Sequence, residues 1–215
     1  MRLKITILIL FITNLSHAQI GSGNSKFCIE IAPLSWLANL EGYSYQLGTE
    51  FRLDNHLSGY VSGEGYFRGG DGDRSNNVRG YNVRLELKYY FNRDAGGQYV
   101  SIEGMYKKQE FNWQDSIHTT PAYQTTFRVS KDVSCLTAKY GCQFLHKSRI
   151  VLDCFVGLGV RFKNVTTTLT QQQVNGLKYN DDSSYESDEI GYLVKPGMYV
   201  LPNLEAGFKI GYQIN

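Results

Sequence analysis

The chain has 215 residues, enough for one domain, and its 22 basic and 20 acidic side chains leave a formal charge of +2 at pH 7. With charges this closely balanced, nothing in the composition suggests a nucleic-acid partner, and none is expected. Apolar residues make up 42% and aromatic residues 13%, with 16 Tyr and 22 Gly, which excludes a disordered composition and favours an all-β protein.

Residues 1–18 have the pattern of an export signal. Two basic residues precede an apolar run from Ile5 to Ile12, and a Ser-His-Ala triplet with small outer residues ends at Ala18. We therefore expect a signal peptide that is cleaved after Ala18, leaving residues 19–215 as one mature domain. The apolar run is too short to cross a bilayer comfortably, and no apolar run of about 18 residues follows it.

Apolar and polar side chains alternate with a period of two along the mature chain, which predicts β-strands. From Tyr81 to Phe91, for example, the odd positions are all apolar or aromatic, and the even positions include Arg84, Glu86 and Lys88. The predicted strands are residues 27–34, 43–53, 57–68, 81–91, 98–109, 133–145, 150–162 and 204–214. Several of them have the length of about 9–11 residues that spans a bilayer when the strand is tilted.

The predicted connections alternate between short and long. The short ones are residues 54–56, 92–97 and 146–149, and the long ones are roughly residues 35–42, 69–80, 112–126 and 164–200. Short periplasmic turns and long outer loops are typical of outer-membrane barrels. The sequence therefore predicts an all-β fold, an eight-stranded antiparallel up-and-down transmembrane β-barrel located in the outer membrane.

One face of the predicted strands is apolar and carries almost no charge. A Lys or Arg at the middle of a bilayer would cost about 2–4 kcal/mol on that face. Lys108 is the clear exception, and it falls near the outer end of a strand, where its long side chain can reach the headgroups. Aromatic residues on this face concentrate towards the strand ends, as expected at the two bilayer interfaces. Outer-membrane lipid is therefore an expected partner.

The opposite face carries charges of both signs, eight positive and seven negative when Lys107 and Lys163 are included. An eight-stranded barrel has an interior just wide enough for side chains to fill, so charges there must pair. We expect lumen ion pairs among Glu30, Glu50, Arg52, Glu64, Arg84, Glu86, Lys88, Glu103, Lys139, Asp153, Arg161, Glu205 and Lys209. An ordinary solvated sheet face would also mix charges.

The four cysteines are Cys28, Cys135, Cys142 and Cys154, and they form no CxxC motif or Cys/His cluster. Cys142 and Cys154 fall on the apolar face, and a tight turn between them would make them neighbours across one hairpin. A disulfide is one interpretation, and free thiols are the favoured one. We expect no metal and no cofactor.

Two further motifs are candidates, one for a calcium site and one for a catalytic site. The Asp- and Asn-containing segment from Gly69 to Asn77 lacks the Gly and Glu that an EF-hand calcium loop requires, so a polar loop tip is favoured. His56-Leu57-Ser58 resembles the His-x-Ser motif of lipid-modifying barrel deacylases, but it lies in a predicted periplasmic turn. Without an orienting third group it does not predict an enzyme.

Three parts of the sequence carry a family resemblance: the signal, the segment from Gly80 to Phe91 and the ending from Leu204 to Ile214. With them, the chain resembles small outer-membrane barrels of the OmpA/OmpX type and barrel families of Bacteroidetes. The resemblance covers nearly the whole mature chain as a pattern. It implies a role in membrane stability or adhesion, and assembly by the barrel-assembly machinery. Family barrels commonly end in an aromatic residue, whereas this chain ends in Ile214-Asn215.

The expected function is a non-enzymatic outer-membrane barrel, either structural or displaying the loops 112–126 and 164–200 to an extracellular partner. Two alternatives remain. One is a soluble periplasmic barrel of lipocalin type, with its apolar face turned inward around a small molecule. The other is a small-solute channel or a lipid-modifying barrel enzyme.

Overall fold

Eight strands and one short helix make up the part of the chain that the structure, a computed structural model, describes: residues 27–33, 43–67, 75–92, 97–117, 123–145, 149–177 and 195–214. The strands are β1 (Phe27–Ile31), β2 (Tyr43–Arg52), β3 (Leu57–Phe67), β4 (Ser75–Tyr90), β5 (Gly97–Ile117), β6 (Tyr123–Leu145), β7 (Ile150–Thr167) and β8 (Gly197–Ile214). The helix is α3 (Gln171–Asn175). The predicted signal peptide and the predicted loop 35–42 lie outside the described residues.

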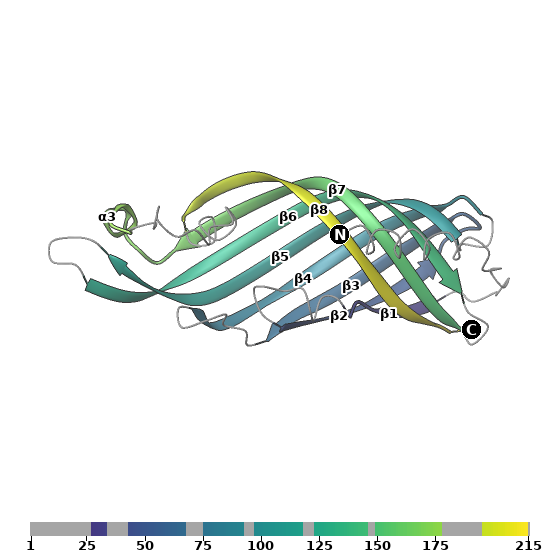
Figure 1. Cartoon of the computed structure of the whole chain (residues 1–215), viewed down its shortest axis with the longest axis horizontal. Helices are drawn as coiled ribbons and strands as arrows, with labels where there is room; N and C mark the ends of the chain where they lie inside the picture. Colours follow the sequence, from purple (N-terminus) through teal and green to yellow (C-terminus); the bar gives the residue numbers. More distant parts are fainter. Residues whose placement is uncertain are drawn as a thin grey trace, which may run out of the picture.

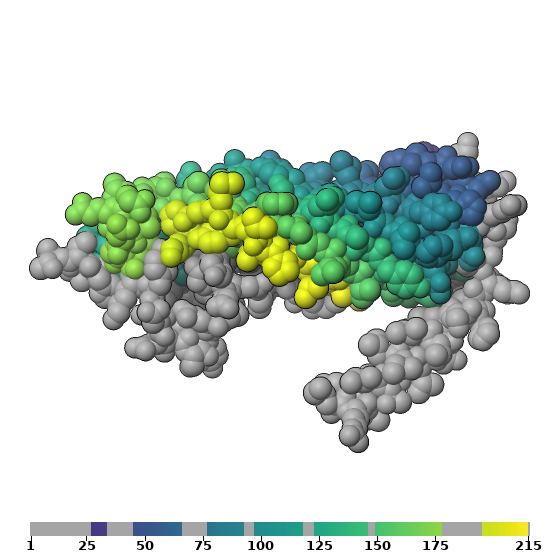
Figure 2. All heavy atoms as spheres, turned by 90° about the horizontal axis from the view of Figure 1, so that it is seen from above, coloured from purple at the N-terminus to yellow at the C-terminus, as the bar shows by residue number. Residues whose placement is uncertain are grey.

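The strands form a closed barrel in which each strand pairs antiparallel with the next one, and β8 returns to β1. This confirms the predicted eight-stranded antiparallel up-and-down β-barrel. The barrel is elongated, with α3 at one end and the last residues of β8 at the other (Figure 1). Figure 2 shows one face of this body, on which β7 and β8 appear in green and yellow. No described helix has the length and apolar character needed to cross a membrane.

The strands differ strongly in length. β5 and β6 have 21 and 23 residues, whereas β1 has 5. The pairing of β1 with β8 therefore runs only from Phe27–Ile214 to Ile31–Ile210. The Ala32 N–H still donates to the Gln46 carbonyl oxygen of β2, and Pro33 follows in a turn. Proline has no N–H to donate there, and the ladder ends.

The predicted loops at the α3 end are shorter than expected. The segment 112–126 is mostly strand, because β5 continues to Ile117 and β6 begins at Tyr123. The segment 164–200 contains the end of β7, α3 and the start of β8. The predicted boundaries at these two positions were therefore wrong, and β4 likewise begins at Ser75 inside the predicted loop 69–80.

A reversal of polarity along the strands explains this error. On β6, the outward side chains from Leu136 to Phe144 are apolar, aromatic or cysteine, and the inward side chains of the same stretch include Thr137, Lys139 and Gln143. Closer to α3 the faces exchange character. The outward side chains there are Gln124, Thr126, Arg128, Ser130, Asp132 and Ser134, and the inward ones include Phe127, Val129 and Val133.

The inward apolar side chains at the α3 end form a compact cluster. Its buried members are Val78, Phe111, Ile117, Phe127, Val129, Val165 and Leu177, and Trp113, Leu169 and Tyr199 pack against them. They come from β4 to β8 and from Leu169 and Leu177, which lie on either side of α3. Thr170 is the N-cap of α3, and its side chain and that of Gln173 form a capping box. This end therefore has the polar outside and apolar inside of a water-exposed β-structure.

Candidate functional site

The charged interior is the most distinctive feature of the barrel. Inward-facing positions are even-numbered in β1 to β4 and odd-numbered in β5 to β8, as the burial pattern shows. All 13 charged residues of the predicted lumen set occupy such positions. Nine are buried, namely Glu30, Glu50, Glu64, Glu86, Lys88, Glu103, Lys139, Asp153 and Lys209. The other four, Arg52, Arg84, Arg161 and Glu205, are partly buried.

Six of these residues form one group, the Lys88 cluster, made of Glu30, Glu50, Glu86, Lys88, Asp153 and Lys209. The Lys88 Nζ lies 2.6 Å from Glu50 Oε2 and 2.7 Å from Asp153 Oδ2. The Lys209 Nζ lies 3.2 Å from Glu86 Oε2, 3.4 Å from Asp153 Oδ2 and 3.7 Å from Glu30 Oε2. Side chains from β1, β2, β4, β7 and β8 thus meet across the interior.

Buried hydroxyl groups complete the hydrogen bonds of this cluster. Tyr90 and Ser58 donate to Glu50 Oε1 at 2.7 and 2.6 Å, and Tyr99 donates to Asp153 Oδ1 at 2.7 Å. The ring of Tyr60 lies 3.8 Å from Lys209 Nζ, in a cation–π arrangement. These tyrosines were missed in the sequence because only charges were considered, although their inward parity could have identified them.

A second group, the Arg84 cluster, lies closer to α3 and consists of Arg84, Glu103, Lys139 and Glu205. Arg84 Nη1 lies 2.6 Å from Glu205 Oε1 and 3.0 Å from Glu103 Oε1. Lys139 Nζ lies 2.6 Å from Glu103 Oε2 and 3.5 Å from Glu205 Oε2. Two cations and two carboxylates alternate, so this cluster is neutral by itself.

Two other predicted residues bind polar neutral partners. Glu64 accepts a hydrogen bond from Asn82 at 2.8 Å. Arg161 donates to Asn203, which in turn donates to Thr137. Arg52 also has an interaction partner. The interior is therefore filled by connected polar side chains, which limits the free space along the barrel axis.

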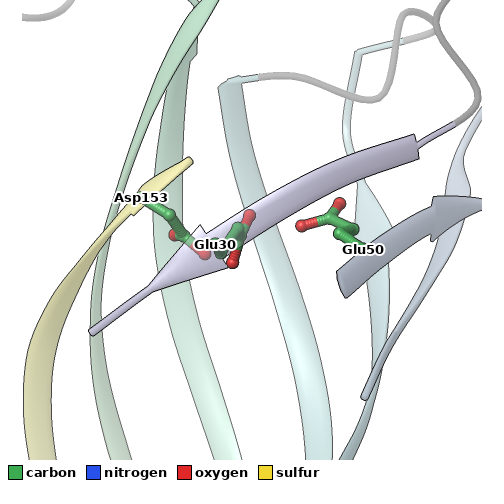
Figure 3. Close-up of side chains that lie close together, drawn as sticks. All are labelled: Glu30, Glu50 and Asp153. Carbon is green, nitrogen blue, oxygen red and sulfur yellow. The ribbon is translucent and has the colours of Figure 1, made fainter. Parts of the chain in front are cut away.

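Three carboxylates of the Lys88 cluster have the spacing of metal ligands. The nearest oxygens of Glu30, Glu50 and Asp153 lie within 4.8 Å of one another, and Figure 3 shows Glu30 between the other two. However, the Lys88 ammonium already bridges Glu50 and Asp153, and hydroxyl donors occupy their remaining oxygens. A cation there would have to displace these donors, so the residues do not fit a metal ion well.

The other sequence candidates occupy separate places. Ser58 points inward to Glu50, whereas the His56 ring stacks on Tyr89 and its Nδ1 lies 2.9 Å from the Tyr90 carbonyl oxygen. The structure therefore does not bring His56 and Ser58 together as a base and a nucleophile.

The cysteines divide between the two faces. Cys142 and Cys154 are direct partners in the pairing of β6 with β7 and are free thiols on the outward face. Cys28 and Cys135 are buried at inward positions and are also free thiols.

These observations define a closed β-barrel whose interior is occupied by two ionic clusters. The chain belongs to the family described as "Protein of unknown function (DUF3575)", whose model matches residues 5–190. No curated protein and no solved structure matches the chain.

Proposed function

We propose that this chain is an integral β-barrel of a bacterial outer membrane, closed to solutes, that carries a folded extension outside the bilayer. The observation that carries the proposal is the reversal of polarity along β5, β6 and β7. A sheet that is apolar outside and ionic inside suits lipid, and a sheet that is polar outside and apolar inside suits water. The boundary between the two regimes would lie at the membrane surface.

The outward apolar side chains form a continuous band, which we call the apolar belt. Among its most exposed members are Leu47, Leu85, Leu87, Ile102, Leu136, Val156, Leu158, Val200 and Leu204, each more than half exposed. Monomeric water-soluble proteins rarely expose a contiguous apolar patch that includes so many large side chains. Lipid contact would remove this surface from water, so the belt supports the membrane location.

The dimensions of the belt agree with a bilayer. On β7 it runs from Ile150 to Phe162, which is about 40 Å along the strand at about 3.3 Å per residue. A tilt of about 45° reduces this to about 28 Å across the membrane, close to the hydrocarbon thickness of about 30 Å. The two ionic clusters lie within the same height, so their charges would be shielded from lipid by the barrel wall.

The interior argues against the two alternatives suggested by the sequence. A lipocalin-type barrel needs an apolar cavity, whereas the described interior holds buried charges on nearly every strand. A channel needs an open path, whereas Lys88, Asp153 and Lys209 meet across the interior of the barrel. We therefore infer a structural or display role for the barrel, comparable to that of the OmpA/OmpX type, with the α3 end as the presented part.

Membrane extraction and gel migration test this proposal. The full chain, expressed with its export signal, should remain in the membrane fraction after carbonate washing and should migrate differently before and after boiling in detergent. In planar bilayers it should give no steady conductance. Recovery of the folded chain from a periplasmic extract without detergent would refute the membrane location, and stable single-channel currents would refute the closed interior.

A further inference from the structure

The outer face of β4 and β5 has an unusual composition where the apolar belt ends. Within the belt, on the side of this boundary away from α3, the outward side chains include Val83, Leu85 and Ile102. At the boundary the rings of Tyr81 and Tyr106 lie 6.2 Å apart, and both are about half exposed. Lys108 is the direct cross-strand partner of Tyr81. In the sequence, Lys108 is the clear exception to the otherwise uncharged outward face.

A second cation lies beside Lys108. Arg79 faces outward and is exposed, and it is the diagonal neighbour of Lys108 because its direct partner is Glu110. Diagonal neighbours have Cβ atoms about 7–8 Å apart, within the joint reach of two long side chains. The Arg79 guanidinium makes no hydrogen bond or ion pair with another described residue.

Each of the two cations has a carboxylate as a direct cross-strand partner, Glu110 for Arg79 and Asp132 for Lys108. Glu110 Oε1 lies 3.9 Å from Lys108 Nζ, a loose contact between two exposed groups that contributes little. Asp132 accepts a hydrogen bond of 2.8 Å from the Tyr106 hydroxyl. Arg128 adds a third exposed cation on the neighbouring strand. Three cations and two carboxylates give this face a net positive charge.

We propose that Arg79 and Lys108, with the Tyr81–Tyr106 ring pair beneath them, bind the phosphate of a phosphorylated glycolipid in the outer leaflet. A guanidinium donates two parallel hydrogen bonds to a phosphate, and an ammonium adds a point charge. Tyrosine rings pack against the glycerol or sugar level of the lipid with their hydroxyls towards water. The inference rests on the proposed membrane location, since it assigns this rim to the headgroup level.

The position of the two cations at the edge of the apolar belt favours a lipid phosphate over a dissolved anion as the ligand. A freely dissolved phosphate would gain nothing from the tyrosine pair or from the belt below it. A lipid phosphate is held at the bilayer surface, where each basic residue contributes about 1 kcal/mol of attraction. Two such residues would then change the affinity about 30-fold, at about 1.4 kcal/mol per tenfold.

Lipid binding to a double variant tests this inference. Arg79→Gln/Lys108→Gln would be compared with the unchanged chain and with Arg149→Gln, an exposed cation at the opposite end of the barrel. Each protein would be placed in phosphatidylcholine nanodiscs with increasing amounts of lipid A, and bound lipid counted by native mass spectrometry. We expect an affinity about 30-fold lower for the double variant and unchanged binding for Arg149→Gln.

Two further arms identify the ligand. Lipid A from which the phosphates have been removed should bind the unchanged chain as weakly as phosphorylated lipid A binds the double variant. Inorganic phosphate should not compete at concentrations that leave the protein folded. Equal binding of lipid A by all three proteins, or full competition by inorganic phosphate, would overturn the inference. The heat-modifiable migration of the double variant separates this outcome from failure of the membrane location itself.

Discussion

Lys88 of β4 and Asp153 of β7 meet across the interior of the barrel, 65 residues apart in the sequence, with Nζ and Oδ2 separated by 2.7 Å. Neither side chain has any exposed surface. Asp153 also faces Lys209, and Lys88 also faces Glu50. A single ammonium therefore bridges two carboxylates that would otherwise repel each other, and Lys209 supplies a second positive charge beside Asp153.

Lys88→Met should destabilise the barrel by about 3–5 kcal/mol, because it leaves Glu50 and Asp153 buried without their shared cation. The free energy of unfolding in urea, measured in detergent micelles or lipid vesicles, gives the magnitude. Arg149→Gln removes an exposed cation at the rim and should change stability by less than about 0.5 kcal/mol. Similar losses for the two variants would contradict the importance of the Lys88 cluster.

Gly141→Ala should destabilise the barrel by about 1–3 kcal/mol, because a Cβ at this position would overlap the ring of Tyr99. Tyr99 is fully buried and holds Asp153 through its hydroxyl, so it has little freedom to move.

Gly63→Ala is the matched control for this substitution, since a Cβ at Gly63 meets no atom within 4 Å. Its stability should be unchanged or about 0.4–1 kcal/mol higher, because alanine reduces the entropy of the unfolded chain. The same unfolding measurement serves both variants. If Gly141→Ala proved as stable as Gly63→Ala, the packing of Tyr99 against β6 would be wrong.

Leu85→Arg distinguishes a lipid-facing surface from a water-facing one. Leu85 is 61% exposed at the centre of the β4 part of the belt. An arginine there should cost about 2–4 kcal/mol in a bilayer, whereas on a water-exposed surface the same change is nearly neutral. Ser130→Arg, placed outward on β6 beyond the belt, should cost about 0–1 kcal/mol. Equal stability of the two variants in vesicles would argue against lipid contact at Leu85.

Thiol accessibility should follow the division of the four cysteines between the two faces. In detergent, a small apolar reagent such as methyl methanethiosulfonate should modify Cys142 and Cys154 first, because they are only partly buried on the outward face. Cys28 and Cys135 should react only after unfolding. Intact-mass measurements over time, followed by peptide mapping, would show two fast and two slow sites. Early modification of Cys28 would contradict its inward position.

Strand alternation allowed the fold and the inward face to be predicted from the sequence. The strong alternation at 81–91 and 150–162 located β4 and β7, and parity alone assigned Glu86 and Asp153 to the interior. The partners within each cluster could not be predicted in the same way. Whether Lys88 meets Asp153 or another carboxylate depends on the register and closure of the whole ring, which involve residues far apart in the chain.

The error at 112–126 has a specific physical origin. The predicted strands cover only segments whose outward side chains are apolar, and β5 and β6 reverse that pattern beyond Lys108 and Ser134. The alternation itself continues there, with Phe111, Ile117 and Phe127 pointing inward. A search for alternation of either sign would have extended both strands. The loop boundary was predicted wrongly because a reversal of the polar and apolar faces was interpreted as the end of a strand.

The early end of β1 has a mechanical consequence. The ring is closed by β1, which pairs with β8 and with β2 over five residue pairs each, whereas β7 and β8 pair over sixteen. Strain applied to the barrel should therefore detach β1 before any other strand. Amide protons of Ile29 and Tyr212 should exchange sooner than those of β5 and β6, and the meeting of the two chain ends should be the closing event of folding.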